Sequence, residues 1–213
     1  MVIRWWGKSF IQLTANSPQE GEVKLMIDPF AVKTIGLRQP KMEVDLVLLT
    51  QGEFDKDVQI KGDYFLVNEP GEYEVKQIFI YGIPELNKDK QPSGRIFYLI
   101  EAEGISVVNL GLGRQVDFTD KQLEFLENPD ILLVPVGGGD SLTARQAAEV
   151  VQRLEPRFIV PINFAFPGAK VKLDKVDNFI KELGIKQTDS KDKLKISSKD
   201  LVGKESELFV INP

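Results

Sequence analysis

Apolar and polar residues alternate in short runs through the first half of the chain, and this pattern predicts β-strands. Strands are expected over residues 2–6, 10–14, 23–27 and 64–68, and two more within 72–83. Residues 45–50 are continuously apolar after Asp45, which is typical of a strand buried on both faces. The runs 95–102 and 105–110 are separated by so short a gap that they predict a hairpin.

The pattern changes in the second half, where helical and strand periods alternate. Helices are expected over 119–127, 143–154 and 173–183, and strands over 131–136, 158–162, 194–197 and 207–211. Thr143 and Gln146 have the spacing of a capping box at the start of the second helix. The chain has no internal repeat or long linker, so we expect one α/β domain over residues 1–213.

Composition narrows the setting in which the protein works. No apolar run approaches the roughly 20 residues of a membrane-spanning helix, and the start "MVIRWWGKSF" lacks the features of a signal peptide. The chain has no cysteine, so nothing indicates a disulfide-stabilised secreted protein. A cytoplasmic protein that makes no use of a membrane is the expectation.

Charge is uneven along the chain. The net charge of −5 disfavours nucleic acid as the main partner, but residues 170–204 hold ten lysines against six acidic residues. This segment is either a docking face for an acidic partner or a solvated helix and hairpin. The acids are interleaved with the lysines, which favours the second interpretation.

Seven segments, taken in order, resemble the metallo-β-lactamase superfamily. They are "WWGKSF", "LMIDPF", "VDLVLLTQGEFDKD", "PGEYEV", "FYLIEAEGISVVNLGLG", "ILLVPVGGG" and "EPRFIVPINF". The nearest branch is the ascorbate-phosphate-lactonase-like group of zinc-dependent hydrolases of the β-lactamase fold. The resemblance runs from residue 1 to about residue 168. It implies an αββα sandwich of two mixed β-sheets with helices on the outer faces and a metal site at the sheet edges.

The metal-binding histidines of that family are missing. The family's His-x-His-x-Asp-His loop corresponds here to Gln51, Glu53, Asp55 and Lys56, so only the aspartate remains. Its His-Leu-Gly-Asp segment begins here with Asn109 and ends with Leu112, which replaces the aspartate that bridges two metals. Two further histidine positions hold Asn163 and, near the N-terminus, Lys8.

These replacements decide against zinc. Protein zinc sites use thiolate, imidazole and carboxylate ligands, and catalytic sites usually hold at least two imidazoles or thiolates. The chain contains no histidine and no cysteine, Lys56 introduces an ammonium group, and Leu112 introduces an isobutyl group. Without zinc there is no bound water of lowered pKa. The sequence therefore predicts a pseudoenzyme without a zinc cofactor, which binds a small polar or anionic ligand or a protein partner. A homo-oligomer is compatible with the sequence.

Two hypotheses describe the remodelled pocket. In the first, Lys56 supplies the positive charge and pairs with Asp55, Glu53 or Asp28. In the second, oxygen atoms bind Mg²⁺, Ca²⁺ or Mn²⁺. The alternative function is a hydrolase that uses such a metal, or metal-free chemistry, at Glu53, Asp55 and Lys56. An ammonium group at residue 56 favours the first. The expected pocket residues for the second are Gln51, Glu53, Asp55, Asn109 and Asn163, and the expected neighbours in both are Lys8, Asp28, Leu112, Gly137, Gly138 and Gly139.

The segment "VGGGDSLTARQ" places three glycines between a strand and a helix. Such a loop could hold an anion at the helix N-terminus, but it lacks the spacing of a phosphate-binding loop. A tight turn is the favoured interpretation. Ser141 and Thr143 are interpreted as helix caps, because the chain has no histidine to activate a nucleophile.

Overall fold

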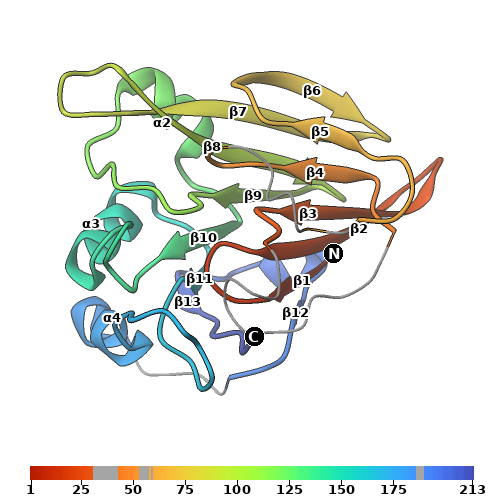
Figure 1. Ribbon diagram of the computed structural model, residues 1–213. Coiled ribbons are helices and arrows are strands. Elements are labelled where there is room, and N and C mark those ends of the chain that lie inside the picture. Colours follow the sequence, from red (N-terminus) through yellow and green to blue (C-terminus); the bar gives the residue numbers. More distant parts are fainter. Residues whose placement is uncertain (31–42, 53–57, 59, 186–189) are drawn as a thin grey trace.

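Two β-sheets packed face to face form the centre of the molecule in the computed structural model (Figure 1). The structure describes residues 1–30, 43–52, 58, 60–185 and 190–213. The strands of the first sheet are, in spatial order, β12 (Leu194–Lys195), β1 (Val2–Trp5), β2 (Ile11–Ser17), β3 (Gly21–Ile27), β4 (Leu46–Leu48) and β5 (Phe65–Val67). Those of the second are β13 (Glu207–Leu208), β11 (Phe158–Ile162), β10 (Ile131–Pro135), β9 (Ile105–Asn109), β8 (Pro92–Ala102), β7 (Ile78–Leu86) and β6 (Gly71–Val75).

Both sheets are mixed. In the first, β12, β1, β2 and β3 pair antiparallel, whereas β4 and β5 continue parallel to β3. In the second, β6 to β9 form antiparallel pairs, and β9, β10, β11 and β13 run parallel. The predicted hairpin is confirmed between β8 and β9, where Glu103 and Gly104 have φ of 57° and 70°, the left-handed backbone of a tight two-residue turn.

The helices that the structure describes lie against the second sheet (Figure 1). Helix α2 (Asp120–Leu126) contacts β7, and α3 (Ala144–Leu154) contacts β10 and packs against α4 (Val176–Leu183). A short 3₁₀-helix, η1 (Ser198–Leu201), follows β12. Capping boxes begin both α2 and α3, and the one at Thr143 confirms the prediction from spacing.

The main core lies between the sheets and follows the period of two along each strand. On β4, Leu46 and Leu48 belong to this core, whereas Val47 faces a second apolar cluster with Phe10 and Met26. The strand is therefore buried on both faces, as its continuous apolar run predicts. The αββα metallo-β-lactamase-type arrangement expected from the resemblance is confirmed, although several strands are shorter than predicted.

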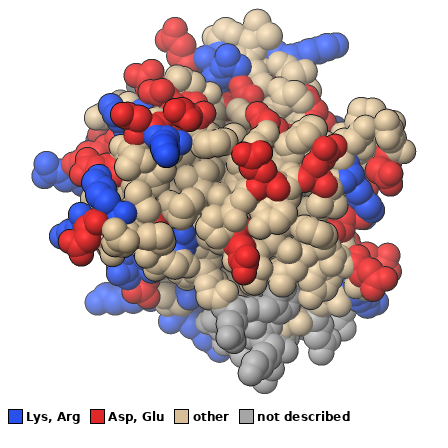
Figure 2. Space-filling model, turned by 90° about the horizontal axis from the view of Figure 1, so that it is seen from above, with Lys and Arg blue, Asp and Glu red and all other residues tan. Residues whose placement is uncertain are grey.

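Charged side chains are not evenly spread over the surface. On the face seen from above, side chains of both signs crowd the left margin, and acidic side chains stand singly around an uncharged middle (Figure 2). None of the helices in the described part of the chain has the length and hydropathy needed to cross a bilayer.

Candidate functional site

The ends of β3 and β4 bring Asp28 and Thr50 together. The Asp28 carboxylate accepts hydrogen bonds from the Thr50 backbone N–H at 2.7 Å and from its hydroxyl at 2.5 Å. Burial raises the pKa of Asp28 to about 6, while these hydrogen bonds act in the opposite direction. Asp28 is thus a carboxyl group that changes charge near neutral pH.

The loop after β9 packs tightly against the end of β4. Asn109 is fully buried, and its Oδ1 accepts a hydrogen bond from the Gly111 N–H at 3.0 Å. Gly111 has φ of 53°, and a Cβ added there would lie 2.4 Å from Oγ1 of Thr50. Only glycine fits this approach. The next residue, Leu112, is buried and stands where the resemblance implies a metal-bridging aspartate.

The end of β11 meets the N-terminal turn and the glycine loop. The backbone N–H of Asn163 donates to the Lys8 carbonyl at 3.0 Å, and its Nδ2 donates to Oγ of Ser141 at 2.9 Å. A Cβ on Gly137 would lie 2.0 Å from the Asn163 carbonyl oxygen. Lys8 and Asn163 both adopt left-handed backbone, with φ of 47° and 52°, which is uncommon outside glycine.

Ser141 and Thr143 have different roles. Thr143 is the N-cap of α3, as predicted, but Ser141 does not cap the helix. Its hydroxyl donates to the Gly138 carbonyl at 3.1 Å and accepts from Asn163. Gly138 and Gly139 have φ of 70° and 65°, so they form the tight turn that the sequence favours.

Part of the expected pocket is therefore brought together. Gly111, two residues after Asn109, packs against Thr50 beside Asp28, and Asn163 meets the N-terminal turn at Lys8. Glu53, Asp55 and Lys56 lie outside the described residues. The pairing of Lys56 with a carboxylate and the oxygen-ligand site both stay predictions.

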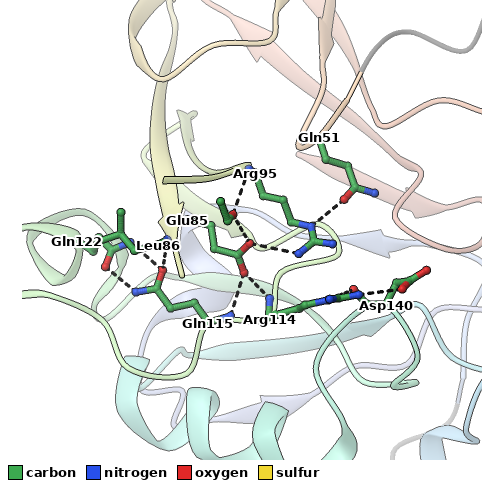
Figure 3. Close-up of polar contacts among 9 residues, drawn as sticks. Gln51, Glu85, Leu86, Arg95, Arg114, Gln115, Gln122 and Asp140 are labelled. Atoms are coloured by element: carbon green, nitrogen blue, oxygen red, sulfur yellow. Dashed lines mark hydrogen bonds and ion pairs between the residues drawn. The ribbon is translucent and has the colours of Figure 1, made fainter. Parts of the chain in front are cut away.

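Gln51 belongs to a different group of side chains. Its Oε1 accepts a hydrogen bond from Nε of Arg95 at 2.8 Å, and the two residues form an isolated antiparallel bridge. Figure 3 shows the Gln51 side chain directed to the Arg95 guanidinium, which in turn lies beside Glu85. The side-chain oxygen of Gln51, which the resemblance places at a metal-ligand position, thus accepts a hydrogen bond from a cationic side chain.

Glu85 is the centre of this second group, which the sequence did not reveal. Its side chain is only 2% exposed, and Nη1 of Arg95 lies 3.5 Å from its Oε2. The carboxylate also accepts from the Ser93 hydroxyl at 2.7 Å, from the Gln115 N–H at 2.9 Å, and from the backbone N–H of Arg114. The buried positions of β7 shift from Ile78 and Ile80 to Ile83 and Glu85, so a strict alternation along the strand does not predict the burial of Glu85.

Two buried polar atoms lack a hydrogen-bond partner among the described residues. They are Nδ2 of Asn109 and Oδ1 of Asn163. Buried amide groups are almost always paired with protein or water. These two atoms are therefore the buried polar groups whose partners the described residues do not supply.

Comparison with known proteins agrees with this fold. The family model described as "Beta-lactamase superfamily domain" matches residues 3–163, so the chain belongs to that superfamily. A protein named UPF0173 metal-dependent hydrolase, from Pyrococcus horikoshii, is 25% identical over 182 residues, covering 68% of this chain and 79% of that protein. A protein of the same name from Pyrobaculum arsenaticum is 23% identical over 202 residues, covering 78% and 86%.

Solved structures show the same architecture over the whole chain. A Thermotoga maritima protein classed as a zinc-dependent hydrolase of the metallo-β-lactamase superfamily has a TM-score of 0.77 and 26% identity, covering 99% of both chains. Igni18, a metallo hydrolase from Ignicoccus hospitalis, has a TM-score of 0.61 at 16% identity, covering 100% of this chain and 95% of its own. The second similarity concerns the fold alone.

Proposed function

We propose that this chain is a zinc-independent member of the superfamily that binds a small polar or anionic ligand and does not perform zinc-dependent hydrolysis. The observation that carries the proposal is the donor set. The 213 residues include no histidine and no cysteine, and a catalytic zinc site usually needs at least two imidazole or thiolate ligands.

The contacts at the former ligand positions support this proposal. Oε1 of Gln51 faces the Arg95 guanidinium, Oδ1 of Asn109 accepts a backbone N–H, and Leu112 offers no donor atom. Within the described residues, no three acidic side chains come close enough together to hold a metal ion. These residues do not fit zinc, and no zinc-bound hydroxide can be assigned to them.

The polar character of the same region favours binding. The unpaired Asn109 Nδ2 can donate and the unpaired Asn163 Oδ1 can accept a hydrogen bond. Asp28 adds a carboxyl group with a pKa of about 6. A ligand with hydroxyl, amide or acid groups could complete these hydrogen bonds, because burying them unpaired costs free energy.

The test combines elemental analysis with an activity screen. The purified chain should contain zinc well below one atom per molecule, and it should show no chelator-sensitive hydrolysis of lactone, phosphodiester or thioester substrates. A zinc-dependent hydrolase assayed in parallel provides the positive control. Steady turnover that a chelator abolishes would contradict the proposal.

A second candidate is a hydrolase that uses Mg²⁺, Ca²⁺ or Mn²⁺, and the names of the curated relatives favour it, since they are called metal-dependent hydrolases. The free Oδ1 of Asn163 is an oxygen ligand of the kind these ions prefer. Stoichiometric manganese or calcium in the purified protein, together with turnover restored by that ion, would establish this candidate instead.

A further inference from the structure

A cleft lies beside Glu85 and Arg95, and none of the described residues that line it stands at a former metal-ligand position. Its volume is about 710 Å³, which is within the range of pockets that hold small molecules. Its lining includes the turn between β7 and β8, which carries Lys88 and Lys90. It also includes Arg114 in the loop after β9 and Gln146 in the first turn of α3.

The cleft is positive on a negative molecule. Four of its lining side chains are cationic, namely Lys88, Lys90, Arg95 and Arg114, and two, Glu85 and Asp117, are acidic. The chain as a whole has a net charge of −5. Glu85 pairs with Arg95 at 3.5 Å, so these two charges largely cancel. Four positive and two negative side chains still leave the lining with a net charge of +2 for a ligand to meet.

The cationic side chains are held by ordered surroundings. Arg95 is fixed by Gln51 on one side and Glu85 on the other (Figure 3). A guanidinium has five N–H donors, and these two contacts leave others for a ligand. Oδ1 of Asn87 accepts the backbone N–H groups of Asp89 and Gln91 at 2.9 and 3.0 Å, which orders the turn that carries both lysines.

Arg114 can exchange its present partner for a ligand. Its Nη2 lies 2.8 Å from Oδ1 of Asp140, but the two side chains are 51% and 88% exposed. Exposed ion pairs are weak because water screens them. An anion in the cleft could therefore compete with Asp140 for the Arg114 guanidinium without breaking a buried contact.

We propose that this cleft binds a small organic anion with two negatively charged groups, either carboxylate or phosphate. Guanidinium groups match both chemistries through paired N–H donors. Arg95 and Arg114 provide two such groups, and the exposed Lys88 and Lys90 add positive charge. The site uses none of the former zinc positions except the carbonyl oxygen of Gln51, which orients Arg95.

The test is isothermal titration of the purified full chain with two probes, inorganic pyrophosphate and succinate, at constant ionic strength. At least one should bind with a dissociation constant below about 1 mM, as expected for several charge-assisted hydrogen bonds. Tighter binding of pyrophosphate would indicate a phosphate ligand, and tighter binding of succinate a dicarboxylate. Failure of both anions to bind at about 10 mM would overturn the proposal.

Variants distinguish the cleft from general attraction by positive charge. Arg114→Gln and the double change Lys88→Gln with Lys90→Gln affect exposed side chains, so the fold should persist. Each should weaken binding about tenfold or more. The matched control is Arg145→Gln, which removes an equal charge from an exposed helix position outside the cleft. Equal weakening by the control would contradict the proposal. Chelator-sensitive hydrolysis would refute the proposed function. It would not affect the anion-binding result, because the substituted residues lie outside the former zinc positions.

Discussion

Replacing Glu85 by glutamine should destabilise the protein strongly, although the side chain keeps its shape. One carboxylate oxygen accepts the backbone N–H groups of Arg114 and Gln115, and the other accepts from Ser93 and lies 3.5 Å from Nη1 of Arg95. Glutamine turns one of these oxygens into a donor. At least one charged contact is then lost and the others are weakened.

The magnitude follows from the number and burial of these contacts. A hydrogen bond to a charged group is worth about 1.5–3 kcal/mol, and leaving a buried partner unsatisfied adds to the loss. We expect a decrease of about 3 kcal/mol in the free energy of unfolding. For a chain of this size, that decrease corresponds to a fall in the melting temperature of roughly 6–12 °C.

Thermal and urea unfolding followed by circular dichroism would measure the change. Glu124→Gln on helix α2 is the control, because that glutamate is exposed and the same substitution should cost less than about 0.5 kcal/mol. In a double-mutant cycle with Arg95→Met, the combined cost should be smaller than the sum of the single costs. A melting temperature within about 2 °C of wild type for Glu85→Gln would refute the reasoning.

Three further changes test other parts of the structure. The raised pKa of Asp28 means that its protonated form stabilises the fold below about pH 4, and that this contribution is lost as the pH rises through about 6. In denaturant titrations, the free energy of unfolding of the wild type, measured relative to Asp28→Asn, should therefore fall by up to about 3 kcal/mol between pH 4 and pH 7. The same difference between the two proteins at every pH would contradict the raised pKa of Asp28. Gly137→Ala should lower the free energy of unfolding by about 3 kcal/mol or more in the same titrations, since its Cβ would lie 2.0 Å from a backbone oxygen. Gly139→Ala is the control. Its Cβ meets no neighbouring atom, so the loss should be about 1 kcal/mol, caused by the positive φ. Tyr98→Phe should lower the free energy of unfolding by about 1–2 kcal/mol, because the buried hydroxyl donates to the carbonyls of Leu49 and Val67 at 2.8 and 3.1 Å. An unchanged free energy of unfolding would mean that this hydroxyl contributes nothing to stability.

Much of the fold could be predicted because the period with which apolar and polar residues alternate reflects the local geometry of strands and helices. The alternation around Tyr73 and Ile80 indicated β6 and β7, and the spacing of Thr143 and Gln146 indicated the start of α3. These signals arise within a few residues of the chain, where strand and helix periods act directly.

The candidate site was harder to predict, because its contacts join distant segments. Gln51 was expected beside the former metal positions, but its side chain bonds Arg95, 44 residues further along. The partners of Glu85 come from the following strand and from the loop after β9. No local period reports such contacts. The burial of Glu85 is also not predicted by alternation, because the buried positions of β7 change phase between Ile80 and Ile83.

The pairing of the first strand with one near the end of the chain bears on how the protein is made. Val2 pairs with Lys195, and the Ile196 N–H donates to the carbonyl of Met1. During synthesis, β1 therefore presents unpaired backbone groups until β12 has left the ribosome, and an open strand edge is where nascent chains join wrong partners. The first sheet thus reaches its final width only after Lys195 has been translated, and release of a chain truncated before β12 would leave a strand ready to associate with other polypeptides.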